Sequence, residues 1–321
     1  MRAIVVAAFG EPDVLRVAGA EPPVVPPGHV LVRVAAAGVN FTDTRQRRGL
    51  EPGIPLPFTP GIEGAGTVAE VGEGVTDVRV GDRVGWQGVL GGYAELALVP
   101  AAAAVPLPDH VTEEQAAAVM LQGLSSHQLA GLAAHTPDGA GTAVVHAAAG
   151  GVGLLLTQIL QLRGYDVIGT VSTEAKAAAA RRAGAREVLL SGDPDLVERV
   201  RDLTGGTGAG IVYDGVGADL FTRSLDALAA GGVLAHFGQA AGPAPDLNPF
   251  DLPRSILLTK PVVTDHVATR DRLLAHAGEL FGWLGAGRLD LTVERFQLAE
   301  AAEAHRRLEG RRSTGKLVLV P

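Results

Sequence analysis

A glycine-rich segment near the middle of the chain has the composition and spacing that binding of a phosphate group requires. Residues 146–153 read His-Ala-Ala-Ala-Gly-Gly-Val-Gly, after an apolar strand-like stretch and before an apolar helix-like run. Glycines permit a tight turn and let backbone amides approach a pyrophosphate, whose charge the following helix N-terminus stabilises. We therefore expect a dinucleotide to bind at Gly150, Gly151 and Val152, through a looser A-x-x-G-x-x-G form of the motif.

The end of the next expected strand, 166–171, indicates which dinucleotide binds. Ser172 and Thr173 follow this strand, and Lys176 lies one helical turn further on. NAD-binding proteins place an acidic residue here, where it accepts hydrogen bonds from the ribose 2′-hydroxyl. Hydroxyls and a cation suit a 2′-phosphate instead, so the sequence favours NADP(H). Glu174 is the dissenting residue, but an acid at a helix start is also favourable for the helix dipole.

Strands and helices alternate through the segment that contains the glycine loop. Apolar strands that alternate with helices predict a parallel, doubly wound sheet, which makes an ordinary glycine turn a poor explanation of the loop. The expected strands lie at 142–147, 166–171, 187–190, 211–214 and 233–237, and the helices at 153–163, 174–183, 194–204 and 220–228.

The flanking parts of the chain have a different pattern. Short apolar runs separated by proline and glycine turns predict a compact, barrel-like domain in the first 120 residues. A capping box from Thr112 to Gln115 predicts a helix start, and further helices are expected at 269–285 and 298–308. The last strand, 316–320, is too short to stand alone, so we expect it to join the first domain and make that domain discontinuous. The early apolar runs are 3–8, 30–35, 66–71 and 93–99.

Composition limits the classes of partner. The chain has 321 residues, 47% of them hydrophobic, which suits about two domains. Its net charge of −8 argues against nucleic acid, and its lack of cysteine excludes disulfides and thiolate metal ligands. There is neither an apolar run of ~18 residues nor a signal pattern, so we expect a cytoplasmic protein with no membrane partner.

Several collinear motifs extend this interpretation over the whole chain. Together they resemble the zinc-independent quinone oxidoreductase (zeta-crystallin-like) branch of the medium-chain dehydrogenase/reductase superfamily. The resemblance implies an α/β protein with a GroES-like β-barrel catalytic domain and an NADP-binding Rossmann domain with a doubly wound parallel sheet. It also implies a cleft that holds the nicotinamide, and commonly a homodimer formed through Rossmann edge strands. The motifs are 37–43, 60–66, 80–84, 146–153, 212–217 and 314–316; the implied domains are 1–121 with 262–321, and 122–261.

Zinc-dependent relatives have a cysteine and a histidine where this chain has Asn40 and Ile62. An amide and an aliphatic side chain replace neither ligand, so we expect no metal. Without zinc to stabilise an alkoxide, an isolated carbonyl is a difficult acceptor. A quinone or conjugated carbonyl is easier, because the charge that follows hydride addition delocalises to a distant oxygen. The prediction is therefore NADPH-dependent reduction of such an acceptor.

The resemblance also implies site residues. Asn40 would face the nicotinamide ribose and the substrate, while His146 is interpreted as a core histidine. Arg45 replaces a tyrosine of many family members, and it would either favour an anionic or carbonyl-rich substrate or face solvent. Water or the cofactor ribose would supply the proton. Further implied cofactor contacts are Ser125, Val216, Phe237, Gly238, Gln239, Leu258, Thr259 and Lys316.

Two alternatives stay open from the sequence. Enoyl and alkenal C=C reductases, in polyketide or fatty-acid metabolism for example, share the Asn40 segment and the glycine loop. A non-catalytic NADPH-binding protein would keep the loop and lack turnover. A panel of quinones and enones, assayed for NADPH consumption, separates the three possibilities.

Overall fold

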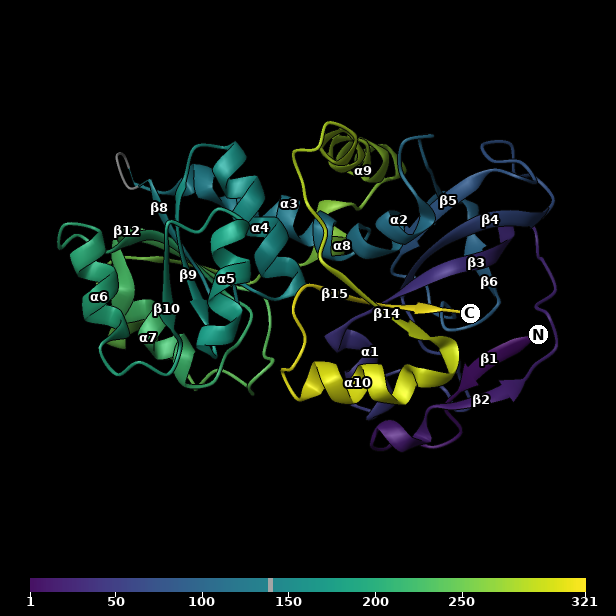
Figure 1. The fold of residues 1–321 in the computed structure, drawn as a ribbon, viewed down its shortest axis with the longest axis horizontal. Helices are drawn as coiled ribbons and strands as arrows, with labels where there is room; N and C mark the ends of the chain where they lie inside the picture. The colour runs from purple at the N-terminus through teal and green to yellow at the C-terminus, as the bar shows by residue number, and fades with distance from the viewer. Residues whose placement is uncertain (138–140) are drawn as a thin grey trace. The chain divides into compact units, whose positions relative to one another are not determined.

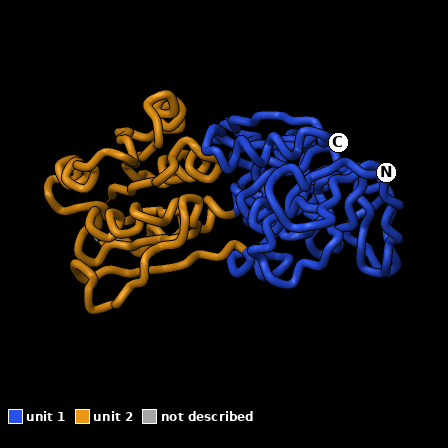
Figure 2. The backbone as a smooth tube through the Cα atoms, turned by 90° about the horizontal axis from the view of Figure 1, so that it is seen from below, with its two compact units in different colours: residues 1–124, 264–321 blue, residues 125–263 orange. Residues whose placement is uncertain are grey.

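The computed structural model describes residues 1–137 and 141–321, which form two compact units (Figures 1 and 2). The first unit comprises residues 1–124 and 264–321, and the second comprises residues 125–263. The first unit is therefore discontinuous in sequence, and its second piece follows the whole of the second unit.

A seven-stranded sheet forms the centre of the first unit. Strands β14 and β15 are parallel to each other, and the other pairs are antiparallel. As expected, the last strand of the chain joins this sheet, because β15 pairs with β3. The sheet order is β14 (Val293–Gln297), β15 (Lys316–Val320), β3 (His29–Val39), β4 (Glu63–Val71), β5 (Arg83–Gln87) and β7 (Val105–Pro106), with β6 (Leu96–Pro100) also paired to β3, and a separate hairpin contains β1 (Arg2–Val5) and β2 (Arg16–Gly19).

Strand register brings three polar residues to one end of this sheet. Leu317 of β15 lies opposite Val39 of β3, and Gly64 of β4 lies opposite Ala37. Lys316, Asn40 and Glu63 follow or precede these paired positions by one residue, so they converge. The core behind them combines Val32, Trp86 and Leu319, all at most 1% exposed. Each such side chain contributes about 1.5–3 kcal/mol when it is fully buried.

Helices α2, α9 and α10 contact strands of the first unit's sheet. Thr112 accepts a hydrogen bond from the Gln115 amide, so the predicted capping box begins α2. Thr269 caps α9 in the same way. Helices α3 and α8 contain the two points at which the chain passes from one unit to the other. The helices are α1 (Phe41–Arg47), α2 (Glu113–Val119), α3 (Gln122–Leu132), α8 (Val263–His266), α9 (Arg270–Gly285) and α10 (Ala301–Glu309).

The second unit is a parallel, doubly wound sheet, as the alternating pattern predicted. The strands run outward from β8 in two directions, so the order reverses between β8 and β11. Helix α4 lies beside α5, and α6 lies beside α7 (Figure 1). The sheet order is β10 (Glu187–Leu190), β9 (Asp166–Val171), β8 (Thr142–Val145), β11 (Ala209–Asp214), β12 (Leu228–His236) and β13 (Leu257–Thr259), and the helices are α4 (Gly151–Leu162), α5 (Glu174–Arg182), α6 (Leu196–Leu203) and α7 (Asp219–Ala227).

Some expected boundaries were wrong. The expected strand at 93–99 starts three residues late, because Tyr93 lies in the preceding turn, where its backbone bonds to Ile4 and Pro60. Strand β12 starts five residues before the expected 233, across an irregular register with β11. Helix α1 and strand β13 were not expected, since both are short and neither has a periodic apolar pattern.

Candidate active site

The glycine loop joins β8 to α4 in the second unit. Ala147 adopts a left-handed conformation with φ 50°, and Gly150 immediately precedes the helix. A Cβ atom on Gly153 would lie 2.3 Å from the carbonyl oxygen of Ala147, so only glycine lets the loop and the helix pack this closely. The first backbone amides of α4 have no partner within the helix, and the helix dipole adds positive potential around them. These features suit an anion.

His146 is a structural residue in this loop. Its Nε2 lies 2.9 Å from Ser224 Oγ, and Ser224 in turn donates to the Leu220 carbonyl. The histidine therefore donates from Nε2, and its Nδ1 accepts from the Thr170 hydroxyl at 2.9 Å. Burial lowers the pKa of His146 to about 4, so the ring is neutral. It links β8, β9 and α7, in agreement with its interpretation as a core histidine.

The three residues expected to bind a 2′-phosphate surround the end of β9. Ser172 and Thr173 are exposed, and Lys176 is half-buried one turn into α5. The carboxylate of Glu174 lies 3.7 Å from Arg181, so a cation further along the helix pairs with the only acid at this position. The two hydroxyls and the Lys176 ammonium can together bind a phosphate, whereas Arg181 compensates the negative charge of Glu174.

Two loops meet at the carboxyl ends of β11 and β12. Asp214 accepts hydrogen bonds from the amides of Val216 at 2.8 Å and Gly217 at 2.9 Å. Its other oxygen lies 3.0 Å from His236 Nδ1. Burial alone would raise the pKa of the Asp214 carboxyl, but these hydrogen bonds, that from His236 foremost, hold it below its usual value. Sequence reasoning missed Asp214 and His236, although the Asp-Gly-Val-Gly segment was a usable signal.

The opposite loop carries three of the expected cofactor contacts, Phe237, Gly238 and Gln239. A Cβ atom on Gly238 would lie 2.8 Å from the Gly215 carbonyl oxygen, so the two loops pack backbone to backbone. The Ala240 amide donates to the same carbonyl at 3.2 Å. Ordered backbone at the carboxyl edge of a doubly wound sheet is where such folds bind ligands.

Asn40 lies in a closed polar cluster of the first unit. Its carboxamide oxygen accepts from Lys316 Nζ at 2.8 Å and from Gln122 Nε2 at 3.0 Å. Its amide nitrogen donates to Glu63 Oε2 at 2.9 Å. These three partners fix the orientation of the side chain, which is 4% exposed.

A buried ion pair completes the cluster. Lys316 Nζ lies 2.5 Å from Glu63 Oε2, with side chains 4% and 0% exposed. The other Glu63 oxygen accepts from the Leu121 amide at 2.5 Å. A Cβ atom on Gly38 would lie 2.1 Å from Glu63 Oε2, so glycine at that position leaves room for the carboxylate. Glu63 was not among the predicted site residues, although the Gly-Ile-Glu-Gly segment that contains it was noticed.

The remaining predicted residues are more exposed. Arg45 on α1 pairs with Glu51 at 2.5 Å and its side chain is 47% exposed, so a catalytic role would require this ion pair to open. Ser125 is half-buried on α3, and Val216 is half-buried beside Asp214. Leu258 is 46% exposed on β13, the edge strand, and Thr259 ends that strand half-buried. Asn40, Arg45 and Lys316 thus belong to the first unit, and the other predicted residues belong to the second.

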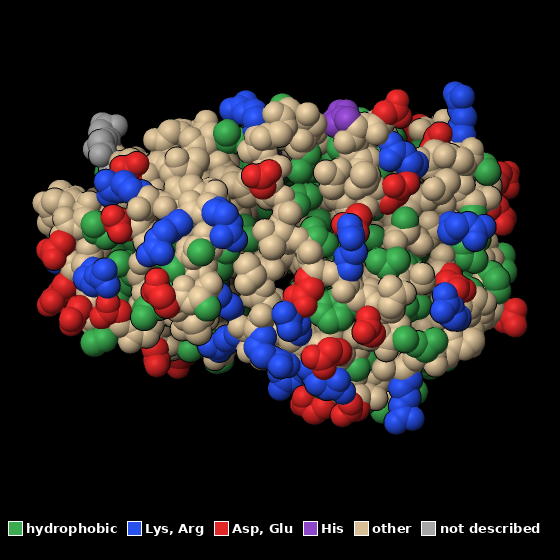
Figure 3. All heavy atoms as spheres, viewed as in Figure 1, with side chains coloured by type: hydrophobic (Ala, Val, Ile, Leu, Met, Phe, Trp, Pro, Cys, Tyr) green, Lys and Arg blue, Asp and Glu red, His purple; other side chains and the backbone are tan. Residues whose placement is uncertain are grey.

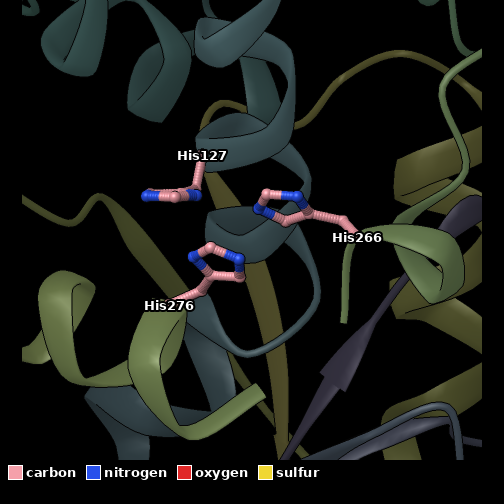
Figure 4. Close-up of side chains that lie close together, drawn as sticks. All are labelled: His127, His266 and His276. Atoms are coloured by element: carbon pink, nitrogen blue, oxygen red, sulfur yellow. The ribbon is translucent and has the colours of Figure 1, made fainter. Parts of the chain in front are cut away.

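Histidines near the unit boundaries are drawn in Figure 4. In the first unit the rings of His266 on α8 and His276 on α9 are stacked, with centroids 4.1 Å apart and planes 9° apart. His127, also labelled there, belongs to α3. None of them was among the predicted site residues.

Two family models match the chain. That of the alcohol dehydrogenase GroES-like domain matches residues 26–109, and that of zinc-binding dehydrogenase matches residues 151–275. A quinone oxidoreductase of Pseudomonas aeruginosa is 43% identical over 319 residues, which cover 98% of each chain. The 2-haloacrylate reductase of a Burkholderia species is 36% identical over 305 residues, which cover 92% of this chain and 91% of the relative.

The similarity extends to solved structures. The crystal structure of Escherichia coli quinone oxidoreductase complexed with NADPH has a TM-score of 0.95 and 36% sequence identity, with 100% of both chains covered. The crystal structure of 2-haloacrylate reductase has a TM-score of 0.87 and 35% identity, with 100% of this chain and 99% of that chain covered.

Proposed function

The chain belongs to the quinone oxidoreductase branch of the medium-chain dehydrogenase/reductase superfamily, and from this premise we propose that it reduces a quinone or a conjugated carbonyl with NADPH and without zinc. The cluster of Asn40, Glu63 and Lys316 is the observation that carries the proposal. It holds the amide of Asn40 where zinc-dependent relatives, by the motif resemblance, would hold a cysteine ligand.

Zinc does not fit these residues. The chain has no cysteine, and the position of the expected histidine is occupied by the aliphatic Ile62. Glu63 Oε2 accepts from both Lys316 and Asn40, and the buried ammonium would repel a divalent cation. We therefore assign no step of the reaction to a metal.

NADPH fits the second unit. The first backbone amides of α4, which have no partner within the helix, suit its pyrophosphate, while Ser172, Thr173 and Lys176 suit its 2′-phosphate. The loops shaped by Asp214 would line the path of the cofactor at the carboxyl edge of the sheet. When bound, NADPH supplies the hydride.

The polar cluster of the first unit would act on the acceptor. Hydride addition to a conjugated carbon moves an electron pair to the carbonyl oxygen, which then takes a proton from water or the cofactor ribose. Asn40, fixed by three hydrogen bonds, would position the acceptor. The charge of Lys316 is compensated by Glu63, so Lys316 would act on the acceptor through Asn40, whose carboxamide oxygen accepts from its ammonium.

The test is consumption of NADPH with a panel of quinones and enones, with NADH and a chelator as controls. We expect turnover with NADPH, slower turnover with NADH, and no effect of the chelator. Loss of activity on chelation, or no binding of reduced nucleotide in a titration, would contradict the proposal.

A second candidate is reduction of activated C=C bonds in α,β-unsaturated acids or aldehydes. It is favoured by the 36% identity to a 2-haloacrylate reductase. Arg45 would assist an anionic acceptor of this kind if it left Glu51. Enones consumed faster than quinones in the same panel would favour this candidate. Tight NADPH binding with no turnover on any acceptor would indicate a non-catalytic protein.

We also propose that the protein is a homodimer formed through β13. This strand is at the free edge of its sheet, where Leu257 is 52% and Leu258 46% exposed. Phe250 in the same unit is 96% exposed. Exposed apolar edges tend to pair with another chain. Leu258→Lys should produce a monomer in light scattering, whereas Val80→Lys, at an exposed apolar position in the first unit, should leave the dimer intact.

Other partners are excluded from the proposal by charge and hydropathy. No helix in the described residues is long and apolar enough to cross a bilayer. The net charge is −8, and acidic and basic side chains are intermixed on the face shown in Figure 3. Such a surface would not attract a nucleic acid. We therefore propose small molecules and a second copy of this chain as partners, in the cytoplasm.

A further inference from the structure

A series of buried hydrogen bonds leads away from Asn40 inside the first unit. The carboxylate of Asp43 accepts from the backbone amide of Asn40 at 2.8 Å and from the Tyr93 hydroxyl at 3.1 Å. The Tyr93 oxygen lies 3.1 Å from His305 Nε2, and His305 Nδ1 lies 3.3 Å from Arg47 Nη1. The side chains of Asp43, Tyr93, His305 and Arg47 are fully buried. They link α1, the turn before β6, and α10.

The chemistry of Arg47 fixes the direction of these bonds. A guanidinium only donates, so His305 Nδ1 must accept and the proton of the neutral ring must be on Nε2. Burial, together with the charge of Arg47, lowers the pKa of His305 to about 3, so the ring is indeed neutral. His305 then donates to Tyr93, and Tyr93 donates to Asp43. Every donor in the series points toward the Asp43 carboxylate.

The far end of the series is anchored at the surface. Arg47 makes two hydrogen bonds of 2.8 Å to Glu309, whose side chain is 24% exposed. A third bond, of 3.0 Å, goes from Arg47 Nε to the Gly10 carbonyl. Glu309 compensates the charge of Arg47, so the buried cation remains in place and continues to donate to His305.

Asp43 receives opposing influences. Burial raises the pKa of the Asp43 carboxyl to about 7, while the Asn40 amide, Lys316 and Tyr93 lower it and Glu63 raises it. Only the ionised carboxylate of Asp43 can accept hydrogen bonds from all of these donors and from the Ile62 amide, at 3.3 Å. Removal of Tyr93 as a donor should therefore shift Asp43 toward its protonated form near neutral pH.

We propose that Tyr93 and His305 are positioning residues for the reductase reaction, because they hold Asp43 as the carboxylate that fixes the backbone of Asn40. With the backbone fixed, the Asn40 carboxamide stays between Lys316, Glu63 and Gln122. Neither Tyr93 nor His305 bonds to Asn40 itself. This role rests on the proposed function, in which Asn40 faces the acceptor.

The first test is the pH dependence of kcat for Tyr93→Phe with a quinone acceptor. Activity requires ionised Asp43, so we expect the acid-side midpoint to move up by about one pH unit, since a hydrogen bond to a charged group is worth at least that much. At pH 7 kcat should fall about fivefold, because the ionised fraction of Asp43 falls from about one half to about one eleventh. The KM for NADPH should change less than about twofold, because the cofactor loop is in the other unit.

A matched control is Tyr213→Phe in the second unit. Like Tyr93, Tyr213 is a buried tyrosine, but its hydroxyl has no hydrogen-bond partner among the described residues. Its removal should leave the midpoint and kcat unchanged. A midpoint in Tyr93→Phe equal to that of this control would overturn the proposal, as would a loss of activity with an unchanged midpoint.

His305 provides the second pair of variants. Gln can still accept from Arg47 and donate to Tyr93, whereas Leu can do neither. We expect His305→Gln to keep a several-fold higher kcat than His305→Leu, with the acid-side midpoint near that of the unaltered chain. Equal activities and midpoints in the two variants would show that only packing matters there. This pair also decides the question if Tyr93→Phe does not fold.

Stability separates this proposal from the proposed function. The pKa of Asp43 is about 7 in the folded chain, against an ordinary value of 3.8, so its contribution to stability falls as pH rises through that window. In Tyr93→Phe the fall should extend upward by about one pH unit. This unfolding measurement needs no substrate. If no acceptor were reduced, the proposed function would fail. If the stability of Tyr93→Phe fell over the same pH range as that of the unaltered chain, the proposed role of Tyr93 would be contradicted instead.

Discussion

Lys316 Nζ and Glu63 Oε2 lie 2.5 Å apart, although 253 positions separate the two residues in sequence. Register explains the meeting, because β15 places Lys316 at the end of β3 and β4 begins with Glu63. Two opposite charges are thereby removed from water together. Their attraction compensates desolvation only while both are present.

Lys316→Met should therefore destabilise the first unit strongly. The substitution leaves the Glu63 carboxylate buried without its cation, which typically costs about 3–5 kcal/mol. The double variant Lys316→Met with Glu63→Gln removes both charges and should recover part of that loss. Denaturant unfolding of both variants measures the difference. Equal losses in the two would show that the ion pair is not the cause.

Gly153→Ala should disrupt the cofactor loop. The new Cβ atom would meet the Ala147 carbonyl oxygen at 2.3 Å and Ala148 Cα at 2.7 Å, both backbone atoms that cannot rotate away. We expect a loss of about 1–3 kcal/mol in stability and at least tenfold weaker NADPH binding.

Gly278→Ala on α9 is the matched control for this glycine. Nothing lies within 4 Å of its added Cβ atom, and the helix interior favours alanine by roughly 0.5–1 kcal/mol. The two substitutions should thus have opposite signs in thermal unfolding. A neutral result at Gly153 would mean that the loop can relax away from the helix.

Lys176→Ala should weaken NADPH binding and leave NADH binding nearly unchanged. The ammonium is expected to pair with the 2′-phosphate, which NADH lacks, so about a tenfold loss is expected for NADPH alone. Lys260→Ala, an exposed lysine in the same unit, is the control. Fluorescence titration with both nucleotides measures the ratio. Equal weakening of the two nucleotides would assign Lys176 to a structural role.

His146→Gln should reduce the acid sensitivity of the second unit. The pKa of His146 is about 4 in the folded chain against an ordinary 6.5, so the unfolded chain binds the proton first as pH falls. The contribution of the neutral His146 ring to the free energy of unfolding is therefore complete above pH 6.5. It decreases by roughly 3 kcal/mol as the pH falls to 4. The variant should take up about one proton fewer on unfolding between these pH values. An unchanged slope in urea unfolding across the window would argue that His146 already becomes charged in the folded state.

Periodic patterns made much of the second unit predictable. Strands β9 and β10 have the bounds that were expected, and the glycine loop lies between a strand and a helix as the motif requires. Each of these depends on contiguous residues. The N-cap at Thr112 could be predicted equally well, because a capping box is a local sequence signal.

The polar cluster could not be predicted in the same way. Glu63 and Gln122 reach Asn40 from different elements, and no spacing in the sequence links them. His305 lies on the buried face of α10, where a sequence pattern would suggest an apolar residue. Its partner Tyr93 is in a turn that was expected to be a strand. Contacts of this kind depend on strand register and on how helices pack on the sheet, which only the folded chain determines.

The discontinuity of the first unit also has a consequence during synthesis. The ribosome completes the whole second unit before it makes β15, the strand that carries Lys316. Translation proceeds at about 5–20 residues per second, so many seconds pass between the synthesis of β3 and that of β15, with which it pairs. A nascent or C-terminally truncated chain would thus hold a finished nucleotide-binding fold and an open catalytic one. If Lys316 acts as proposed, we expect reductase activity only after β15 has been translated.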